Sequence, residues 1–216
     1  MTAKSPAPRR RGRPRGVQRT SDLEPREEIL RHAAVLFSTA GVSGTRVADI
    51  ASSVGVSSPA IYNWFENLDA IVEALLDYVV VESAAFATAV ARRPGRCTER
   101  LQALITRHVE RLTSGPYDLW FVAGLSETEL LRFPSVGRRA SQWRRAVTRL
   151  VHEGIEAGEF DPIDTQFAVA AVSGLVYGAL QLRHTHGAVD AAAVAEMAVR
   201  SLVQRRTDPR GRMPTR

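Results

Sequence analysis

Three small groups of side chains in this sequence could catalyse a reaction or hold a metal, and two of them contain histidine or cysteine. His184 and His186 are imidazoles two residues apart, and Cys97 is a thiol beside the cation of Arg96. A spacing of two turns side chains away from each other on a helix. The histidines therefore fit cations favoured at a helix C-terminus better than a metal pair. We interpret Cys97 as an ordinary residue at a helix start.

The acids around Pro162 are the third candidate group. Glu159, Asp161 and Asp164 fit a turn and a helix N-cap better than a catalytic carboxylate pair. The chain has no G-x-S-x-G sequence, no glycine-rich phosphate loop and no H-E-x-x-H sequence. We therefore expect no catalytic residues, no metal and no cofactor. An enzyme is kept as the rival class of function.

A different kind of chemistry is encoded between Val47 and Phe65, in the stretch VADIASSVGVSSPAIYNWF. Short hydroxyls and methyl groups suit the edges of bases and the methyl group of thymine. The free N–H groups at a helix start suit a phosphate, and aromatic hydroxyl or amide groups offer further donors. The side chains expected to face outward are Ser57, Ser58, Pro59, Ala60, Tyr62, Asn63 and Trp64.

Two short helices must position these side chains. One is predicted over Val47–Val54 with Thr45 as its N-cap, and the second runs from Ser57 through Trp64. Gly55 lies in the tight turn between them. Apolar side chains on both helices lock the crossing angle, which predicts a helix-turn-helix. These side chains are Ile50, Ala51, Val54, Ile61 and Phe65.

The region Glu24–Leu76 resembles the TetR family of one-component transcriptional regulators. The matching positions, at matching spacing, are Gly41, Thr45, Ile50-Ala51, Gly55-Val56-Ser57, Ile61-Tyr62 and Phe65. The resemblance implies a homodimer that binds a palindromic double-stranded DNA operator and responds to a small molecule. The sign most common in the family is repression relieved by that ligand.

Three positions depart from the family pattern. Arg46 stands where a second Thr is common, Trp64 where His is common, and Leu68 where Lys is nearly habitual. Loss of that Lys removes a phosphate contact at the start of the long helix. Arg46 is expected to replace it electrostatically, so Arg46 joins Thr45 among the predicted DNA contacts.

A second DNA-directed signal precedes the helices. Residues 11–16 read RGRPRG, and this core resembles the AT-hook, which lies extended in a narrow A·T minor groove. The predicted contacts are Arg11, Arg13 and Arg15. The alternative is a basic tail that only aids solubility or binds DNA without sequence preference.

Charge is distributed unevenly over the 216 residues. Residues 1–19 carry seven basic and no acidic side chains, and residues 205–216 carry five arginines and one aspartate. Subtracting these tails from the net charge of +6 leaves −5 for the body between them. A basic arm on an acidic body indicates a polyanionic partner that is reached locally.

The 44% hydrophobic content is that of a globular protein, and apolar periodicity predicts an all-α fold of about nine helices. We expect a disordered arm over 1–22, a helix-turn-helix domain over 23–68, a ligand-binding and dimerisation domain over 69–206, and a disordered tail over 207–216. The other expected helices are Glu24–Ala40, Asn67 to before Pro94, Thr98–Thr113, Tyr117–Arg132, Val136–Ala157, Asp164–Thr185 and Ala191–Arg205.

The apolar run Phe167–Leu180 has 14 residues, fewer than the roughly 18–20 that cross a bilayer. With no signal peptide evident and one cysteine, the chain is expected to be cytoplasmic, with no membrane partner. Within this run, Ala170, Gly174 and Gly178 form a stripe of small residues that lets another helix approach closely. The resemblance assigns this helix and the last one to the dimer interface. Close packing within one chain is the alternative.

An effector pocket in the body is also implied by the resemblance. Its candidate side chains combine an apolar face with a polar group: Tyr78, His108, Tyr117, Trp120, Phe121, Trp143 and Tyr177. Each fits a plain core residue as well, and we expect Trp120 and Phe121 to be the best placed. A hydrophobic or amphipathic effector is predicted. A further rival is an architectural DNA-binding protein without effector control.

Overall fold

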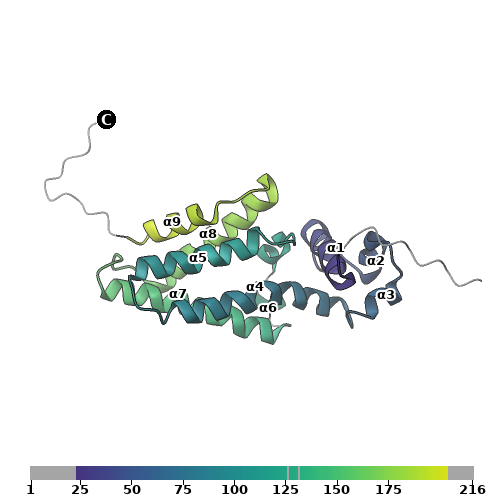
Figure 1. Cartoon of the computed structure of the whole chain (residues 1–216), viewed down its shortest axis with the longest axis horizontal. Helices are drawn as coiled ribbons and strands as arrows, with labels where there is room; N and C mark the ends of the chain where they lie inside the picture. The colour runs from purple at the N-terminus through teal and green to yellow at the C-terminus, as the bar shows by residue number, and fades with distance from the viewer. Residues whose placement is uncertain (1–22, 126, 131, 204–216) are drawn as a thin grey trace, which may run out of the picture.

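The computed structural model describes residues 23–125, 127–130 and 132–203, and these residues fold into helices with no β-strand. The all-α prediction is confirmed. Eight α-helices have five or more residues, and a four-residue helix and a 3-10 helix lie between α5 and α7 (Figure 1). The elements are α1 Pro25–Ala40, α2 Val47–Val54, α3 Ser58–Tyr62, α4 Leu68–Val90, α5 Cys97–Thr113, η1 Trp120–Gly124, α6 Glu127–Leu130, α7 Pro134–Glu156, α8 Thr165–His186 and α9 Ala191–Arg200.

The helices α1 to α3 form a unit at one end of the molecule (Figure 1). Gly41 ends α1 at φ 76° with its N–H bonded to the Phe37 carbonyl, and Gly55 ends α2 at φ 81°, as expected of these glycines. The third helix is shorter than predicted. It ends at Tyr62, and Trp64 lies in the turn that follows, where its N–H donates to the Ile61 carbonyl.

Helix α4 leads from this unit into the larger body (Figure 1). Asn67, where the sequence predicted this helix to start, is its N-cap, because its side-chain oxygen accepts the N–H of Ala70 at 2.9 Å. Over its 23 residues α4 packs against α1 near its start and against α5 and α7 further along. A single helix is therefore shared by both parts of the molecule.

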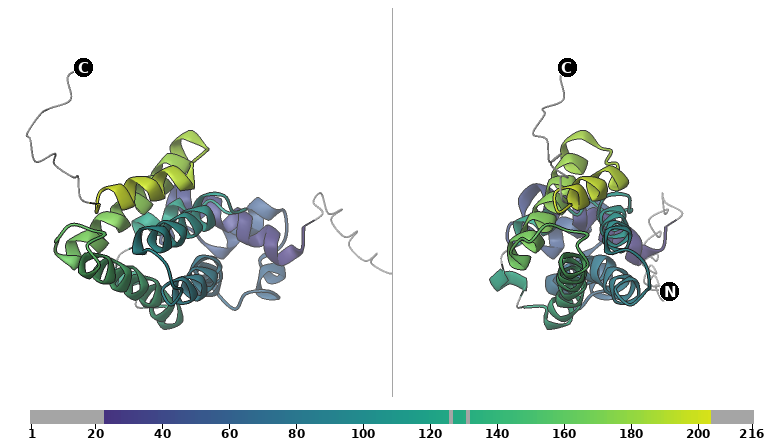
Figure 2. Two further views of the ribbon diagram at one scale, coloured as in Figure 1. Left: turned by 60° about the vertical axis from the view of Figure 1, so that its left-hand side comes forward. Right: turned by 90° about the vertical axis from the view of Figure 1, so that its left-hand side faces the viewer.

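The body is built around α5, which packs against α4, α7, α8 and α9, while α8 and α9 lie together along one side (Figure 2). The N-terminus of α5 is capped from a distant loop. Both carboxylate oxygens of Glu159 accept backbone N–H groups there, from Cys97 and Thr98, each at 3.0 Å. The largest fully buried side chains of the body are Leu101, Leu104, Ile105, Leu119, Leu150, Leu180 and Leu202.

Two further predicted helices are wrong in extent. Tyr117–Arg132 is not one helix, because residues 117–119 are not helical and the 3-10 helix η1 follows them. Asp118 opens η1 by accepting the N–H of Trp120. Its later part is the short α6. Helix α9 ends at Arg200 rather than Arg205, and the chain then turns so that the Leu202 carbonyl accepts the N–H of Asp161.

Helix α8 is longer than the apolar run within it. An 18-residue window of this 22-residue helix has a mean hydropathy of 1.3, which is enough by length and composition alone to cross a membrane. One face of α8 is buried against the body, including Ala168, Val172, Val176 and Leu180. Arg183, His184 and His186 lie in its last turn, the place predicted for favourable cations.

Candidate DNA-binding and effector sites

The second helix of the helix-turn-helix presents most of its predicted side chains to solvent. Ile61 is fully buried and holds α3 against the core, which turns the other positions outward. Tyr62 and Trp64 are 53% and 47% exposed, although both are large aromatic residues. Ser57, Pro59 and Asn63 are also exposed, and Ser58 and Ala60 are half-buried. The segment thus offers a contiguous surface of hydroxyl, methyl and aromatic groups.

Thr45 does not lie where the sequence predicted. It is buried, and its hydroxyl donates to the Gly41 carbonyl at 2.8 Å, so its side chain is used inside the chain. The N-cap of α2 is Arg46, whose N–H is accepted by Asp49 at 2.8 Å. The side chain of Arg46 is exposed and makes no ion pair among the residues that the structure describes. Arg11, Arg13 and Arg15 lie outside the described residues.

Two contacts that the sequence did not predict join α1 to the rest of the helix-turn-helix. His32 Nδ1 lies 2.6 Å from the Ser53 hydroxyl on α2. The Arg26 guanidinium lies 5.2 Å from the centre of the Phe65 ring, a cation–π distance. Both pairs join residues more than 20 positions apart, so no local pattern reveals them. They fix α2 and the turn after α3 relative to α1.

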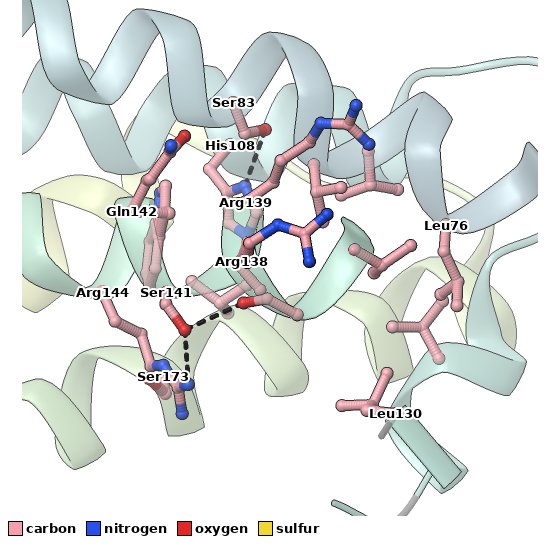
Figure 3. A pocket seen from close by; sticks show the side chains of 18 of the residues that line it. Leu76, Ser83, His108, Leu130, Arg138, Arg139, Ser141, Gln142, Arg144 and Ser173 are labelled. Atoms are coloured by element: carbon pink, nitrogen blue, oxygen red, sulfur yellow. Dashed lines mark hydrogen bonds between the residues drawn. The ribbon is translucent and has the colours of Figure 1, made fainter. Parts of the chain in front are cut away.

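A cavity of about 790 Å³ opens in the body between α4, α5, α7 and α8 (Figure 3). Three of the seven predicted effector contacts line it, namely His108, Trp143 and Tyr177. The rings of His108 and Trp143 lie 4.5 Å apart. Apolar side chains make up much of the wall: Leu76, Val79, Val80, Leu112, Val122, Val136, Val176 and Leu180.

Two polar side chains of the inner wall, His108 and Trp143, carry no charge. His108 Nδ1 lies 2.9 Å from the Ser83 hydroxyl, and burial lowers the pKa of His108 to about 4, so the ring is neutral at pH 7. The indole Nε1 of Trp143 is buried without a hydrogen-bond partner in the described part of the chain. An unpaired buried N–H is costly, and a ligand acceptor would satisfy it.

The other four predicted effector contacts do not line the 790 Å³ cavity. Tyr78 packs edge-on against Tyr117 at 4.8 Å. Trp120 stacks on His184 at 5.4 Å, and Phe121 packs against Phe37 on α1. These aromatic residues therefore join elements to one another. Trp120 and Phe121 line only a smaller cavity of about 310 Å³ between α1 and η1.

Apart from Trp143, sequence reasoning missed the contribution of α7 to the cavity. Its polar residues there are Arg138, Arg139, Ser141, Gln142, Arg144 and Arg145, and Figure 3 labels all but the last of them. The density of arginine along Val136–Ala157 was visible in the sequence. Nothing local indicated that one face of this helix borders a cavity.

The stripe of small residues on α8 is open in the part of the chain that the structure describes. Ala170 and Gly174 are exposed, and a Cβ built on Gly174 or Gly178 meets nothing within 4 Å. Packing among the described residues therefore does not explain the stripe. Large apolar side chains are exposed around it, with Phe167 at 64% and Met197 of α9 at 60%.

Catalytic and metal chemistry gain no support from the geometry. Within residues 23–125, 127–130 and 132–203, no three His, Cys, Asp or Glu side chains are grouped to hold a metal. Burial, followed by the nearby charge of Glu159, raises the pKa of the Cys97 thiol, the opposite of what a thiolate nucleophile requires.

Comparison with known families agrees with this geometry. Residues 29–75 match the family model described as bacterial regulatory proteins, tetR family, and residues 94–205 match the Tetracyclin repressor-like, C-terminal domain. The chain belongs to the TetR family. This family consists of DNA-binding transcriptional regulators rather than enzymes, and its members bind small-molecule effectors and act as dimers.

Individual relatives agree with the TetR assignment. The HTH-type transcriptional repressor KstR2 of Mycobacterium tuberculosis is 28% identical over 145 residues, which cover 63% of this chain and 70% of KstR2. The crystal structure of Mycobacterium smegmatis AmtR superposes with a TM-score of 0.73 at 30% identity, covering 84% of this chain and 87% of AmtR. The KstR2 structure superposes with a TM-score of 0.72 at 22% identity, covering 84% and 96% of the two chains.

Proposed function

We propose that this TetR-family protein is a repressor that binds a palindromic operator as a homodimer and is released by a small hydrophobic or amphipathic effector. The observation that carries the proposal is the position of α4. This helix begins shortly after Phe65, a buried residue at the end of the exposed Ser57–Trp64 segment. Further along, it supplies Leu76, Val79 and Ser83 to the 790 Å³ cavity. One rigid element thus touches both sites.

The proposed reading surface is the exposed part of Ser57–Trp64. Short side chains at the start of α3 approach base edges in the major groove, while Tyr62 and Asn63 add donors for bases or phosphates. Arg46 supplies charge next to this surface, and Arg11, Arg13 and Arg15 of the preceding arm reach the minor groove. Residues 23–68 are the proposed DNA-binding domain and 69–206 the proposed effector and dimer domain.

The proposed dimer interface is the open face of α8 together with α9. Ala170, Gly174 and Gly178 allow close approach of the partner's helices, and exposed Phe167 and Met197 lose solvent contact there. Two-fold symmetry of this kind presents two copies of α3 to half-sites about 34–36 Å apart, or a multiple of that spacing. A palindromic operator is the DNA counterpart. The site of action is the cytoplasm.

Release follows from a shift between two tilts of α4. An effector that binds better to one tilt changes the separation of the two α3 helices in the dimer. A coupling of about 1–3 kcal/mol would change operator affinity roughly 5- to 150-fold. The rival architectural role, without effector control, gives no reason for a cavity of this size bordering α4.

The test is selection of the operator from a random duplex library by the full chain, followed by a gel shift with lipophilic compounds. We expect an inverted repeat to be enriched and at least one compound class to release it. A protein with Tyr62→Ala should lose the enriched site and keep weak binding to random DNA. Equal affinity for all DNA sequences at every salt concentration would contradict the proposal and favour the architectural role.

A further inference from the structure

The charges that line the 790 Å³ cavity are all of one sign. Arg138, Arg139, Arg144 and Arg145 of α7 line it, and none of its lining residues is Asp or Glu. Figure 3 shows the first three of these arginines among the lining side chains, with the apolar Leu76 and Leu130. Charges of one sign beside low-dielectric walls concentrate the opposite charge.

Most of this positive charge is uncompensated. Arg138, Arg144 and Arg145 make no ion pair with any residue that the structure describes, and Arg144 has only a long 3.4 Å contact to the Ser141 hydroxyl. Because His108 is neutral, the inner wall adds no further charge. The cavity therefore combines an apolar interior with free guanidinium groups, which match the carboxylate or phosphate group of an amphiphile.

Arg139 is the exception, and its partner lies on α4. Its Nη1 is 2.6 Å from Oδ1 of Asp77. Asp77 is the last of three acids spaced four residues apart on one face of α4. The other two also contact the start of α7 and the residues before it: Glu73 accepts the hydroxyl of Ser135 at 2.5 Å, and Asp69 pairs with Arg132.

This row of contacts fastens α4 to α7. It runs from the first turn of α4, next to the proposed reading surface, as far as the cavity. Arg139 belongs to both the row and the cavity lining. An anion that binds in the cavity competes with Asp77 for the same guanidinium group, and every hydrogen bond that this group donates to the anion weakens the link to α4.

We propose that the effector is an amphiphile with a carboxylate or phosphate head group, and that this head group takes Arg139 from Asp77 and so frees α4 from α7. This inference rests on the proposed function, because it specifies the ligand class and the switch of the same cavity. Free protein keeps the Asp77–Arg139 pair and the operator-binding tilt. Bound protein loses both.

The ligand class is tested by calorimetry on the full chain with probes that share one tail, dodecanoate, dodecyl phosphate and dodecan-1-ol, each below its micelle concentration. Both anions should bind more tightly than the alcohol. Arg139→Gln should weaken the anions about tenfold, the loss of one charge-assisted contact, and leave the alcohol unchanged. The control is Arg149→Gln, on the same helix but paired with Glu153 and absent from the lining.

The switch is tested with Asp77→Asn. Without any probe, this variant should bind the selected operator more weakly, by up to about fivefold, because the pair is partly exposed. The anionic probes should release wild-type protein from DNA and have a smaller effect on Asp77→Asn. Operator affinity in the Glu73→Gln variant, which keeps a group able to accept the Ser135 hydroxyl, serves as the matched comparison.

Equal affinity for the anions and the alcohol, or an anion preference that survives Arg139→Gln, would overturn the inference. So would an absence of binding by every probe. These outcomes leave operator selection untouched, because that experiment uses no probe. Conversely, failure to select an operator refutes the proposed function while calorimetry still reports the charge preference of the cavity.

Discussion

The ring of Phe37 on α1 packs against the ring of Phe121 on η1, with centroids 5.4 Å apart. Beside them, the hydroxyl of Ser38 donates to the Asp118 carbonyl and accepts the Phe121 N–H, each at 3.2 Å. Asp118 also lies 3.4 Å from Nδ1 of His184 on α8. The DNA-binding end is thus joined to the body at a second place besides α4. This junction continues through Asp118 to α8, the proposed dimer helix.

Replacement of Ser38 by Ala tests this junction. Both backbone groups that it satisfies are partly buried and would lose their partner, so the free energy of unfolding should fall by about 1–2 kcal/mol. Urea unfolding at fixed protein concentration measures it. The neighbouring Thr39→Ala is the control, since Thr39 bonds only to carbonyls of α1 itself and should change stability by less than about 0.5 kcal/mol. Equal losses would show that the junction carries no special stability.

Arg46 is predicted to contact the DNA backbone. Its side chain is exposed beside the reading surface and has no acidic partner among the described residues. Arg46→Ala should weaken binding to operator and random DNA alike, and reduce the slope of log affinity against log salt by about 1. Fluorescence anisotropy across a salt series measures the slope. Arg92→Ala, exposed beyond the far end of α4, should leave it unchanged, and an unchanged slope in Arg46→Ala would remove Arg46 from the contacts.

The helical periodicity and the end signals allowed most of the fold to be predicted. Asn67 and Asp164 cap α4 and α8 with their side chains, and Gly41 and Gly55 end α1 and α2, because these signals act within a few residues. The segment after Pro116 was predicted wrongly. Its apolar residues satisfy a helical pattern, but they pack against α1 and α8, partners that lie far away in the sequence.

The distinction between local signals and packing against distant parts of the chain applies to the candidate sites as well. The outward face of α3 could be predicted because Ile61 and Phe65 occupy the inward positions of a short local motif. The cavity could not be predicted, since its volume depends on how far apart α4, α5, α7 and α8 lie. Aromatic residues with a polar group were a poor guide to it: His108 reaches the cavity, whereas Trp120 stacks on a histidine outside it.

The exposed apolar face of α8 and α9 predicts the effect of a charge at Met197. Met197→Glu would place a carboxylate inside the proposed interface, where its desolvation is costly, and should convert the dimer to monomer at micromolar concentration. Light scattering after gel filtration measures the mass. Val81→Glu is the control, because Val81 is 47% exposed on α4, away from α8 and α9, and should remain a dimer. A Met197→Glu protein with unchanged mass would exclude this face as the interface.

The neutral state of His108 predicts a loss of stability in acid. Its pKa is about 4 in the folded chain against an ordinary value of 6.5, so the unfolded chain takes up a proton first as the pH falls. This difference should cost about 2 kcal/mol between pH 7.5 and pH 5. Urea unfolding at both pH values measures it. His108→Gln, which does not titrate, should lose less stability over this range, whereas exposed His152→Gln should behave as wild type. Identical pH dependence in all three would show that His108 is not the cause.

The cap on α5 predicts a large effect from a single loop residue, Glu159. Burial raises the pKa of Glu159, but the hydrogen bonds from Thr98 and Cys97 and the charge of Arg96 together lower it by more, so the pKa ends below its ordinary value. The ionised form is thus the one that stabilises the fold. Glu159→Ala should lower the free energy of unfolding by about 1–2 kcal/mol at pH 7, as loss of a helix N-cap does.

The deficit of Glu159→Ala should be fully present above pH 4.5, the ordinary value for a glutamate, and shrink as lower pH protonates the wild-type carboxylate. Glu159→Gln keeps one acceptor and should lie between the two proteins. Glu156→Ala, which removes an exposed carboxylate paired only with His152, is the control and should stay within about 0.5 kcal/mol of wild type. If the two alanine variants are equally stable, α5 does not depend on this cap.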